Sequence, residues 1–401
     1  MIRSAEISHY KSVAEASLRF RDQVVIVGPN GSGKSNILDA IYFLRDCVVD
    51  DIDTAVTKRH GIDSIRQWSR TRPYNIILSL SFENSEGSGS YRVVISSSKG
   101  NYRILEEFGT WSGPSPRLRY RATNEPAEHG FSSFARGEDG RLVFTSTFDD
   151  YGVERPHRVD PEELFLTSLS GRLVLPPLNL FRQIAEELIS FSKYNIYPNT
   201  LRDPQLVSKD LVLRENGSNV GSILKRLNSN RRLSRNKDDI ISAVRMLMPS
   251  VVDIQVRSAG GYYVPVLRVE EDNGDVHDFN LSQISDGTLR TLGLLTAFYQ
   301  PNAPEKIGIE EPEQMIHPGA LPVFAEAMAD FVKGGSGGER QVLITTHSPT
   351  LLDLVDPRDI VWARLKRGVT ECGAVSNRQL KVIKEQLFTA GELLLSEGFF
   401  A

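Results

Sequence analysis

The sequence predicts an α/β protein with a parallel core sheet, an added antiparallel β-subdomain and a helical insertion. From residue 286 onward, helical and strand patterns alternate, which is typical of a parallel sheet covered by helices. Near the N-terminus, an apolar strand pattern at 24–27 leads through a glycine-rich segment into an amphipathic helix pattern. Strand-like alternation in 74–148 and helical periodicity in 161–248 predict the two additions.

The composition is ordinary for a folded protein. Its 401 residues suffice for two or three average domains, or for one large α/β domain with an insertion. The net charge is −4, so no overall basicity indicates binding to nucleic acid or to an anionic membrane. Cys47 and Cys372 lack metal-ligand spacing, and no apolar run approaches about 20 residues. We therefore expect a cytoplasmic protein that does not enter a membrane.

The first predicted elements are strands at 2–8 and 16–27, followed by a glycine-rich loop and a helix. The helix is predicted by apolar residues three or four positions apart, which are Ile37, Ile41, Leu44 and Val48. The loop reads Gly28-Pro29-Asn30-Gly31-Ser32-Gly33-Lys34-Ser35. It matches the phosphate-binding pattern G-x-x-x-x-G-K-[ST] in the strand–loop–helix context that this pattern requires.

The residue types in this loop suit a nucleoside triphosphate. Glycines let the backbone wrap around phosphates, and the loop N–H groups and the helix N-terminus attract anions. Lys34 adds a positive charge, and the Ser35 hydroxyl is a ligand for Mg²⁺. We expect a nucleoside triphosphate and Mg²⁺ to contact Asn30, Gly31, Ser32, Gly33, Lys34 and Ser35.

The remaining elements divide the chain into three predicted parts. Residues 1–160 form a nucleotide-binding lobe that includes the antiparallel strands of 74–148, which clusters of Gly, Ser, Asn and Pro separate. Residues 161–250 form the helical insertion, and residues 251–401 complete the core. Strands are predicted at 251–257, 262–270, 276–280, 305–310, 340–346 and 359–365, and helices at 286–299, 318–333 and 349–354.

Three motifs in the last part bear functional residue types. The strand before Glu310 and Glu311 is apolar, so Glu310 is placed to reach Mg²⁺ and Glu311 to orient or deprotonate a water. A solvated acidic turn would give the same local pattern. Ser285 and Gly287 begin a helix and could bind an anion, although a plain N-cap also explains them. His347 ends a buried strand, as either a phosphate-binding or a structural histidine.

The order of these motifs resembles the ABC-class ATPase heads of the RecF/SMC group. The chain looks most similar to OLD-like stand-alone ATPases of bacteria, many of which belong to anti-phage defence operons. The resemblance spans nearly the whole chain, including the opening at 7–12 and the tail at 391–394. It implies a P-loop NTPase fold of the ABC type and ATP hydrolysis that depends on Mg²⁺.

The resemblance also implies roles for single residues. Lys34 and Ser35 would hold phosphates and Mg²⁺, Glu310 would bind the metal ion and Glu311 would be the catalytic base. His347 would be the switch histidine, and Ser285 with Gly287 would contact ATP bound to a second subunit. Two further candidates are Lys11 near the phosphates and Gln67 as the metal-sensing glutamine, for which a surface glutamine is the alternative.

The sequence departs from this group in two respects. Position 310 is Glu where most ABC proteins have Asp. The chain has no room for long coiled-coil arms, and the segment after His347 is too short for a Toprim nuclease domain. We therefore expect any effector nuclease to be a separate protein.

A basic cluster lies within the predicted helical insertion. It consists of Lys225, Arg226, Arg231, Arg232, Arg235 and Lys237. Such a cluster suits contact with a phosphate backbone, and a solvated charged loop is the alternative. No aromatic residue interleaves with it, so stacking on bases is not indicated.

The resemblance thus implies an ATPase that forms a head-to-tail homodimer, or a higher oligomer, with ATP at the interface. Hydrolysis would gate a partner effector or a DNA contact, with anti-phage defence as the expected setting and no membrane involved. A RecF-type DNA repair ATPase is one alternative. The other is an ATP-locked scaffold that cages a toxic effector nuclease.

Overall fold

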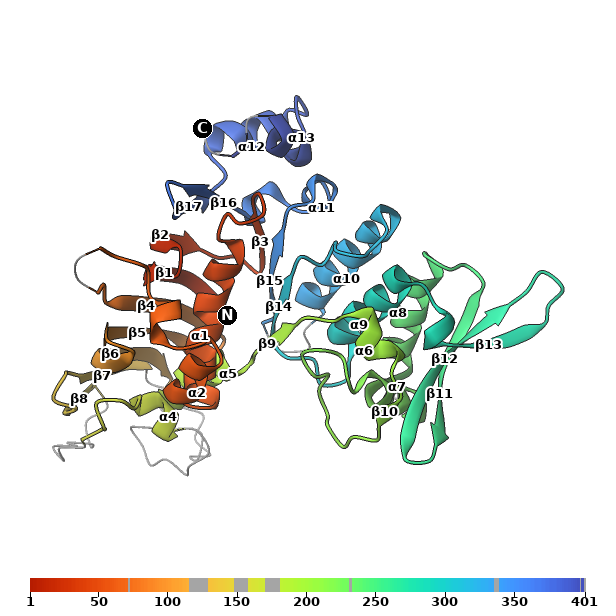
Figure 1. Ribbon diagram of the computed structural model, residues 1–401. Coiled ribbons are helices and arrows are strands. Elements are labelled where there is room, and N and C mark those ends of the chain that lie inside the picture. The colour runs from red at the N-terminus through yellow and green to blue at the C-terminus, as the bar shows by residue number, and fades with distance from the viewer. Residues whose placement is uncertain are drawn as a thin grey trace. The chain divides into compact units, whose positions relative to one another are not determined.

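The computed structural model describes residues 1–70, 73–114, 129–147, 158–169, 181–230, 233–334, 339–396 and 398–399. Contacts divide the chain into two compact units, whose elements are labelled in Figure 1. The first unit comprises residues 1–191 and 361–375, and the second comprises residues 192–360 and 376–399. The three-part division predicted from the sequence cuts the chain elsewhere and stays a prediction.

A mixed sheet with the order β8-β7-β6-β5-β4-β1-β2-β17-β16-β3 forms the centre of the first unit. Its strands are β1 (Ile2–Tyr10), β2 (Val13–Arg19), β3 (Gln23–Val27), β4 (Ile76–Asn84), β5 (Gly87–Ser98), β6 (Asn101–Pro114), β7 (His129–Arg136), β8 (Leu142–Ser146), β16 (Ile360–Lys366) and β17 (Val369–Ala374). Neighbouring strands from β4 to β8 are antiparallel, which confirms the antiparallel sheet predicted in 74–148. In contrast, β17 pairs in parallel with β2.

The strand predicted at 16–27 is two strands, so this prediction was wrong in its extent. The chain leaves β2 after Arg19 and enters β3 at Gln23. The Phe20 N–H donates to the carbonyl oxygen of Arg3 at 2.8 Å, and Asp22 pairs with the guanidinium of Arg3 at 3.0 Å. These contacts hold a polar turn where the hydrophobic pattern suggested a continuous strand.

The helices of the first unit are α1 (Lys34–Val49), α2 (Ile52–Thr57), α3 (Ile62–Ile65), α4 (Phe165–Leu169) and α5 (Phe181–Ile189). The apolar stripe predicted for α1 is buried at all four positions from Ile37 to Val48. This helix lies along the sheet and contacts β1, α2, α4 and α5 (Figure 1). Burial of the stripe therefore fixes the helix that follows the phosphate loop.

The second unit contains two groups of strands. The first has the order β15-β14-β9, with β9 (Phe191–Tyr194), β14 (Lys306–Glu310) and β15 (Gln341–Thr346), and β14 and β15 are parallel. The second is antiparallel, and its strands are β10 (Gln205–Leu206), β11 (Val251–Ala259), β12 (Tyr262–Glu270) and β13 (Val276–Asn280). In that sheet β12 pairs with each of the other three strands.

The helices of the second unit are α6 (Pro198–Arg202), α7 (Val220–Ser229), α8 (Ser234–Arg245), α9 (Asp286–Tyr299), α10 (Leu321–Lys333), α11 (Pro349–Leu352), α12 (Asn377–Lys384) and α13 (Ala390–Ser396), with 3₁₀ turns at Leu281–Gln283, Pro318–Ala320 and Pro357–Asp359. The largely buried α9 contacts α6, α7, α8 and α10. Its bounds agree with the predicted helix at 286–299.

Candidate nucleotide-binding and catalytic site

The phosphate loop connects β3 to α1 in the first unit. Residues 24–27 of β3 are buried, and α1 begins at Lys34 after Gly33, which has a φ of 94°. Gly31 has a φ of 77°. Because this left-handed backbone favours glycine, both glycines are needed for the path of the loop.

Close approaches from neighbouring strands also restrict the loop. A Cβ at position 28 would lie 2.0 Å from the carbonyl oxygen of Ala363, on β16. A Cβ at position 33 would lie 1.9 Å from Oγ1 of Thr370, on β17. Strands from the far end of the sequence thus leave room only for glycine at Gly28 and Gly33.

The polar side chains of the loop suit an anionic ligand. Lys34 is only 4% exposed, and its Nζ donates to the carbonyl oxygens of Gly28 at 2.9 Å and Pro29 at 3.1 Å. Ser32 Oγ is buried and has no hydrogen-bond partner within the described residues. Buried polar atoms normally have partners, so phosphate oxygens fit this loop. Ser35 is exposed in the first turn of α1, where a metal ion could reach its hydroxyl.

Lys11 lies against α1. Its Nζ is 2.7 Å from Oδ2 of Asp39, which also pairs with Arg59 at 2.9 Å and accepts a 2.6 Å hydrogen bond from the Tyr10 hydroxyl. Burial alone would raise the pKa of Asp39, but Arg59, Lys11 and Tyr10 hold it below its ordinary value. Lys11 therefore anchors α1, and its predicted contact with phosphates stays a prediction.

Gln67 follows α3 and binds β1. Its Oε1 lies 2.9 Å from Nδ1 of His9, and its N–H donates to the His9 carbonyl oxygen at 2.9 Å. The His9 ring stacks on Tyr74, with the ring centroids 4.2 Å apart. These contacts fix the glutamine amide, and its role as a metal sensor stays a prediction.

The acidic turn begins where β14 ends in the second unit. Glu310 lies opposite Thr345 of β15 in the parallel register. Its Oε1 pairs with Nζ of Lys193, from β9, at 2.8 Å. The carboxylate predicted to bind the metal ion is thus already balanced by a cation, which the sequence did not reveal.

Glu311 has an unusual backbone conformation. Its φ is 43°, in the left-handed region that residues other than glycine rarely adopt. Its N–H donates to the Thr345 carbonyl oxygen at 2.9 Å, and its carbonyl oxygen accepts from Nη2 of Arg290 at 3.1 Å. Arg290 is buried in α9, and its Nη1 donates to the Ile196 carbonyl oxygen at 3.0 Å. Backbone strain held by surrounding contacts is typical of functional sites.

His347 lies beside two carboxylates. Its Nδ1 is 3.2 Å from Oε1 of Glu313 and 3.6 Å from Oε1 of Glu311. The same Glu313 oxygen accepts from the His347 N–H at 2.8 Å and from the Thr346 hydroxyl at 2.7 Å. The sequence analysis did not single out Glu313, although it is the third acid of the same turn. The structure therefore brings Glu311 and His347 together and adds Glu313 to them.

The start of α9 is open to solvent. Ser285 is exposed, and its Oγ accepts from the Thr288 N–H at 3.3 Å, so Ser285 is an ordinary N-cap of α9. A Cβ at Gly287 would lie 3.0 Å from the Met315 carbonyl oxygen. A pocket of about 220 Å³ here is lined by Met246, Leu247, Ser285, Gly287, Thr288, His317, Gly319 and Ala320. A ligand at this helix start stays a prediction.

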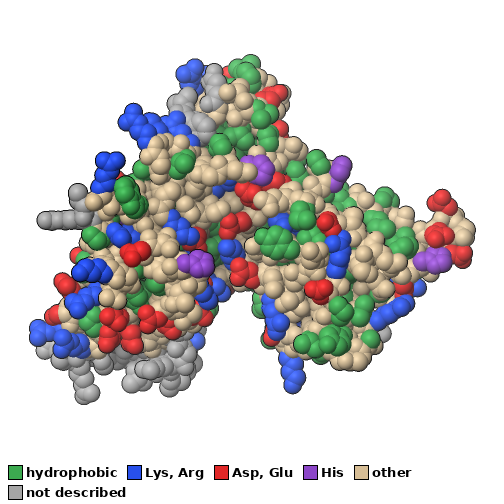
Figure 2. Space-filling view, viewed as in Figure 1, with side chains coloured by type: hydrophobic (Ala, Val, Ile, Leu, Met, Phe, Trp, Pro, Cys, Tyr) green, Lys and Arg blue, Asp and Glu red, His purple; other side chains and the backbone are tan. Residues whose placement is uncertain are grey.

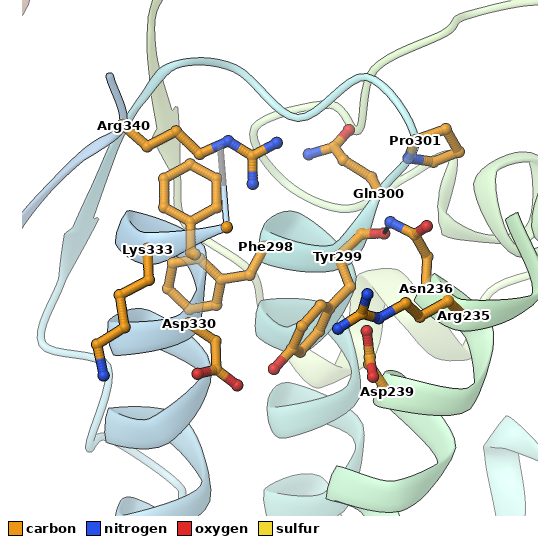
Figure 3. Close-up of a pocket in the computed structure, with 12 residues that line it drawn as sticks. Arg235, Asn236, Asp239, Phe298, Tyr299, Gln300, Pro301, Asp330, Lys333 and Arg340 are labelled. Atoms are coloured by element: carbon orange, nitrogen blue, oxygen red, sulfur yellow. Dashed lines mark hydrogen bonds between the residues drawn. The ribbon is translucent and has the colours of Figure 1, made fainter. Parts of the chain in front are cut away.

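The basic cluster is only partly described, because Arg231 and Arg232 lie outside the described residues. Lys237 pairs with Asp253 at 2.6 Å, whereas Arg235 lines a separate pocket of about 530 Å³. In that pocket the Arg235 side chain points toward Tyr299, while Arg340 approaches from the other side (Figure 3). On the face that Figure 2 shows, basic and acidic side chains are interspersed.

Two further observations concern metal ions and membranes. No group of three or more His, Cys, Asp and Glu side chains in the described ranges is arranged to hold a metal ion. A metal ion held by Ser35 or Glu310 would thus take most of its ligands from phosphate oxygens and water. None of the helices in the described part of the chain is long and apolar enough to cross a membrane.

The family model described as "AAA domain, putative AbiEii toxin, Type IV TA system" matches residues 24–353, which is more than half of the chain. The chain belongs to this family. A protein of Helicobacter pylori named ATP/GTP phosphatase is 20% identical to this chain over 358 residues. The match covers 89% of this chain and 88% of that protein. The DNA replication and repair protein RecF of Porphyromonas gingivalis is 46% identical over 48 residues, which are 12% of this chain and 13% of RecF.

A solved structure confirms the fold. The SMC head bound to the C-winged helix domain of ScpA matches with a TM-score of 0.53 and 15% identity, covering 95% of this chain and 99% of that chain. The predicted α/β class and ABC-type P-loop fold are therefore correct. Family and fold together identify this chain as a P-loop ATPase with the fold of the SMC head.

Proposed function

We propose that this ATPase requires Mg²⁺, works as a head-to-tail dimer with ATP at the interface, and gates a contact with a partner. The observation that carries the proposal is the cluster of Glu311, Glu313 and His347 at the ends of β14 and β15. Carboxylates and an imidazole at the carboxyl ends of parallel strands suit activation of water and stabilisation of a transferred phosphoryl group.

The phosphate loop supplies the binding half of this proposal. Lys34 and the loop N–H groups bind the phosphates, and the buried Ser32 hydroxyl adds a donor. Ser35, Glu310 and Gln67 are each proposed as residues that would hold Mg²⁺. When bound, Mg²⁺ neutralises charge on the phosphate oxygens. The ion pair with Lys193 keeps the Glu310 carboxylate oriented before nucleotide binds.

Glu311 and His347 supply the catalytic half. Glu311 accepts a proton from the attacking water, and its strained backbone is held by Thr345 and Arg290. Nδ1 of His347 faces two carboxylates, which are hydrogen-bond acceptors, so Nδ1 carries a proton. Nε2 of His347 would donate to the γ-phosphate in the imidazolium form, in which both ring nitrogens carry protons.

The start of α9 supports the dimer. Ser285 and Gly287 lie at the exposed N-terminus of a 14-residue helix, where unpaired N–H groups favour an anion. We propose that this helix start meets the γ-phosphate of ATP bound to the second subunit. Each subunit would then need its partner to complete hydrolysis.

The proposed setting is phage defence in the cytoplasm, with a separate effector nuclease as the gated partner. Support comes from the family description, which includes a putative toxin of a type IV toxin–antitoxin system. The SMC head in the matching structure is bound to ScpA, which is a precedent for a partner on this fold. Both described cysteines are free, in agreement with a reducing compartment.

Two other functions are kept as alternatives. The matched RecF segment favours a DNA repair ATPase, in which DNA would stimulate turnover. Arg235 and its basic neighbours would then contact phosphates, and replacing such contacts lowers the salt slope of binding by about 0.9 per phosphate. An ATP-locked scaffold that cages a toxic effector would instead turn over slowly and ignore DNA.

Steady-state turnover tests the proposal. We expect hydrolysis of ATP that stops when Mg²⁺ is chelated and that rises more than linearly with protein concentration, because the active form is a dimer. GTP is measured in parallel, since the Helicobacter pylori relative is named for both nucleotides. Strong stimulation by duplex DNA would favour repair, and a rate per subunit independent of protein concentration would argue against the dimer.

A further inference from the structure

A chain of side-chain hydrogen bonds joins the phosphate loop to distant parts of the first unit. Nδ2 of Asn36 donates to Oγ of Ser12 at 2.7 Å. The hydroxyl oxygens of Ser12 and Thr370 lie 2.7 Å apart, and Oγ1 of Thr370 donates to the Ser32 carbonyl oxygen at 3.0 Å. The four residues come from α1, the turn after β1, β17 and the phosphate loop.

The two ends of this chain fix the direction of every hydrogen bond. The Asn36 NH₂ group can only donate, so Ser12 Oγ is its acceptor. The Ser32 carbonyl oxygen can only accept, so Thr370 uses its single hydroxyl proton there. Ser12 must therefore donate to Thr370. Hydrogen bonds that run in one direction strengthen one another.

We propose that Thr370 and Ser12 are positioning residues that hold the phosphate loop in its nucleotide-binding conformation, an inference that rests on the proposed ATP site. The Ser32 carbonyl and the Gly33 N–H belong to one trans peptide and point in opposite directions. Holding the carbonyl toward Thr370 therefore turns the Gly33 N–H to the opposite side of the loop. Donors aligned in this way form a binding surface for phosphate oxygens.

Thr370 is a rigid support for this purpose. It is buried, and its N–H donates to the Ser12 carbonyl oxygen at 2.8 Å, so backbone and side chain bind the same turn. Its Cα pairs with that of Val13 in the parallel register between β17 and β2. The Oγ1 atom also fills the space that a Cβ at Gly33 would need. The hydroxyl thus acts on the loop from a fixed position.

Ser12 is held equally firmly. Two residues just before Ser12 have left-handed backbone, namely His9 near the end of β1 with a φ of 57° and Lys11 in the turn with a φ of 49°. The Lys11 N–H donates to the Ile65 carbonyl oxygen at 2.6 Å, and His9 is bound by Gln67. The loop is therefore connected through this turn to the segment that contains Gln67.

ATP affinity in Thr370 variants, measured by calorimetry with Mg²⁺, tests the proposal. Thr370→Val removes the hydroxyl with little change of shape and should weaken binding about tenfold. Thr370→Ser keeps the hydroxyl and should bind within about threefold of wild type. Ser12→Ala should weaken binding similarly. In the double variant with Thr370→Val, the fold-loss of ATP affinity should be smaller than the product of the two single fold-losses. Thr110→Val is the control, because Thr110 on β6 also pairs with a serine hydroxyl, that of Ser90, at 2.8 Å.

Amide hydrogen exchange without nucleotide provides a second readout. In Thr370→Val and Ser12→Ala, the amides at 31–35 should exchange faster than in wild type, and Thr370→Ser should restore slow exchange. Wild-type affinity and wild-type exchange in Thr370→Val would overturn the proposal. Equal losses in Thr370→Val and Thr370→Ser would overturn it too, since packing would then explain them. If Thr370→Val does not fold, ATP affinity and hydrogen exchange are measured in Ser12→Ala instead. Wild-type affinity and wild-type exchange in that variant would then overturn the proposal. A wild type that fails to bind ATP would refute the proposed function instead.

Discussion

Oε1 of Glu313 accepts a hydrogen bond from the backbone N–H of His347 at 2.8 Å and lies 3.2 Å from Nδ1 of the same residue. One carboxylate oxygen thus fixes both the backbone and the ring of the histidine. The Glu313 side chain is only 8% exposed. Such contacts favour one ring orientation with a proton on Nδ1, so that Nε2 is the ring atom available to a phosphate.

Replacing Glu313 should impair turnover through His347. Glu313→Leu leaves the His347 N–H and the Thr346 hydroxyl without their acceptor, and we expect the rate constant for hydrolysis to fall at least about tenfold. Glu313→Gln can still accept these bonds and should lose less. In a His347→Ala background, Glu313→Leu should cost little more, whereas additive losses would refute the coupling. Glu326→Gln, on the exposed face of α10, is the matched control.

Lys34→Ala should abolish measurable nucleotide binding. The buried ammonium supplies charge-assisted hydrogen bonds, and their loss should cost about 2–4 kcal/mol of binding free energy. Calorimetry with ATP and Mg²⁺ measures the effect. Lys11→Ala removes a nearby lysine that pairs with Asp39, and its ATP affinity tells whether Lys11 also contacts phosphates. Wild-type affinity in Lys34→Ala would refute the assignment of the loop.

Ser285→Arg should let each subunit bind ATP but prevent ATP-dependent dimerisation. A long side chain at the exposed start of α9 would block the approach of a second subunit's phosphate. Light scattering with ATP checks the result. The control is Ser282→Arg, at an exposed position of the preceding 3₁₀ turn. A normal dimer of Ser285→Arg would rule out this helix start as the trans contact.

Asp39→Asn should destabilise the first unit at neutral pH. Because Arg59, Lys11 and Tyr10 hold the pKa of Asp39 below its ordinary value, the ionised form contributes stability above the unfolded-state pKa of about 3.9. That contribution is lost as the pH falls through the lower folded-state pKa. Urea unfolding should therefore show a loss of at least about 1 kcal/mol at pH 7 that shrinks toward pH 3. Asp22→Asn, which removes an exposed ion pair with Arg3, should change little.

The sequence predicted local features better than long-range contacts. The phosphate loop and α9 are encoded in contiguous patterns, which is why their bounds agree with the structure. Thr370 could not be predicted as a support of the loop, because only the pairing of β17 with β2 brings it to Ser32. Lys193 and Arg290 are likewise single charged residues that contact Glu310 and Ile196, which lie far along the chain. Glu313 did carry a signal, as the third acid in a short turn.

The mass of Glu311→Gln with and without ATP and Mg²⁺ tests the central claim most directly. The amide can position a water but cannot accept its proton, so hydrolysis should slow by roughly 10²–10⁴-fold while ATP binding persists. We predict that this variant is a monomer without nucleotide and a stable dimer with two ATP molecules bound. A variant that stays monomeric with ATP bound, or hydrolyses ATP at the wild-type rate, would contradict the account.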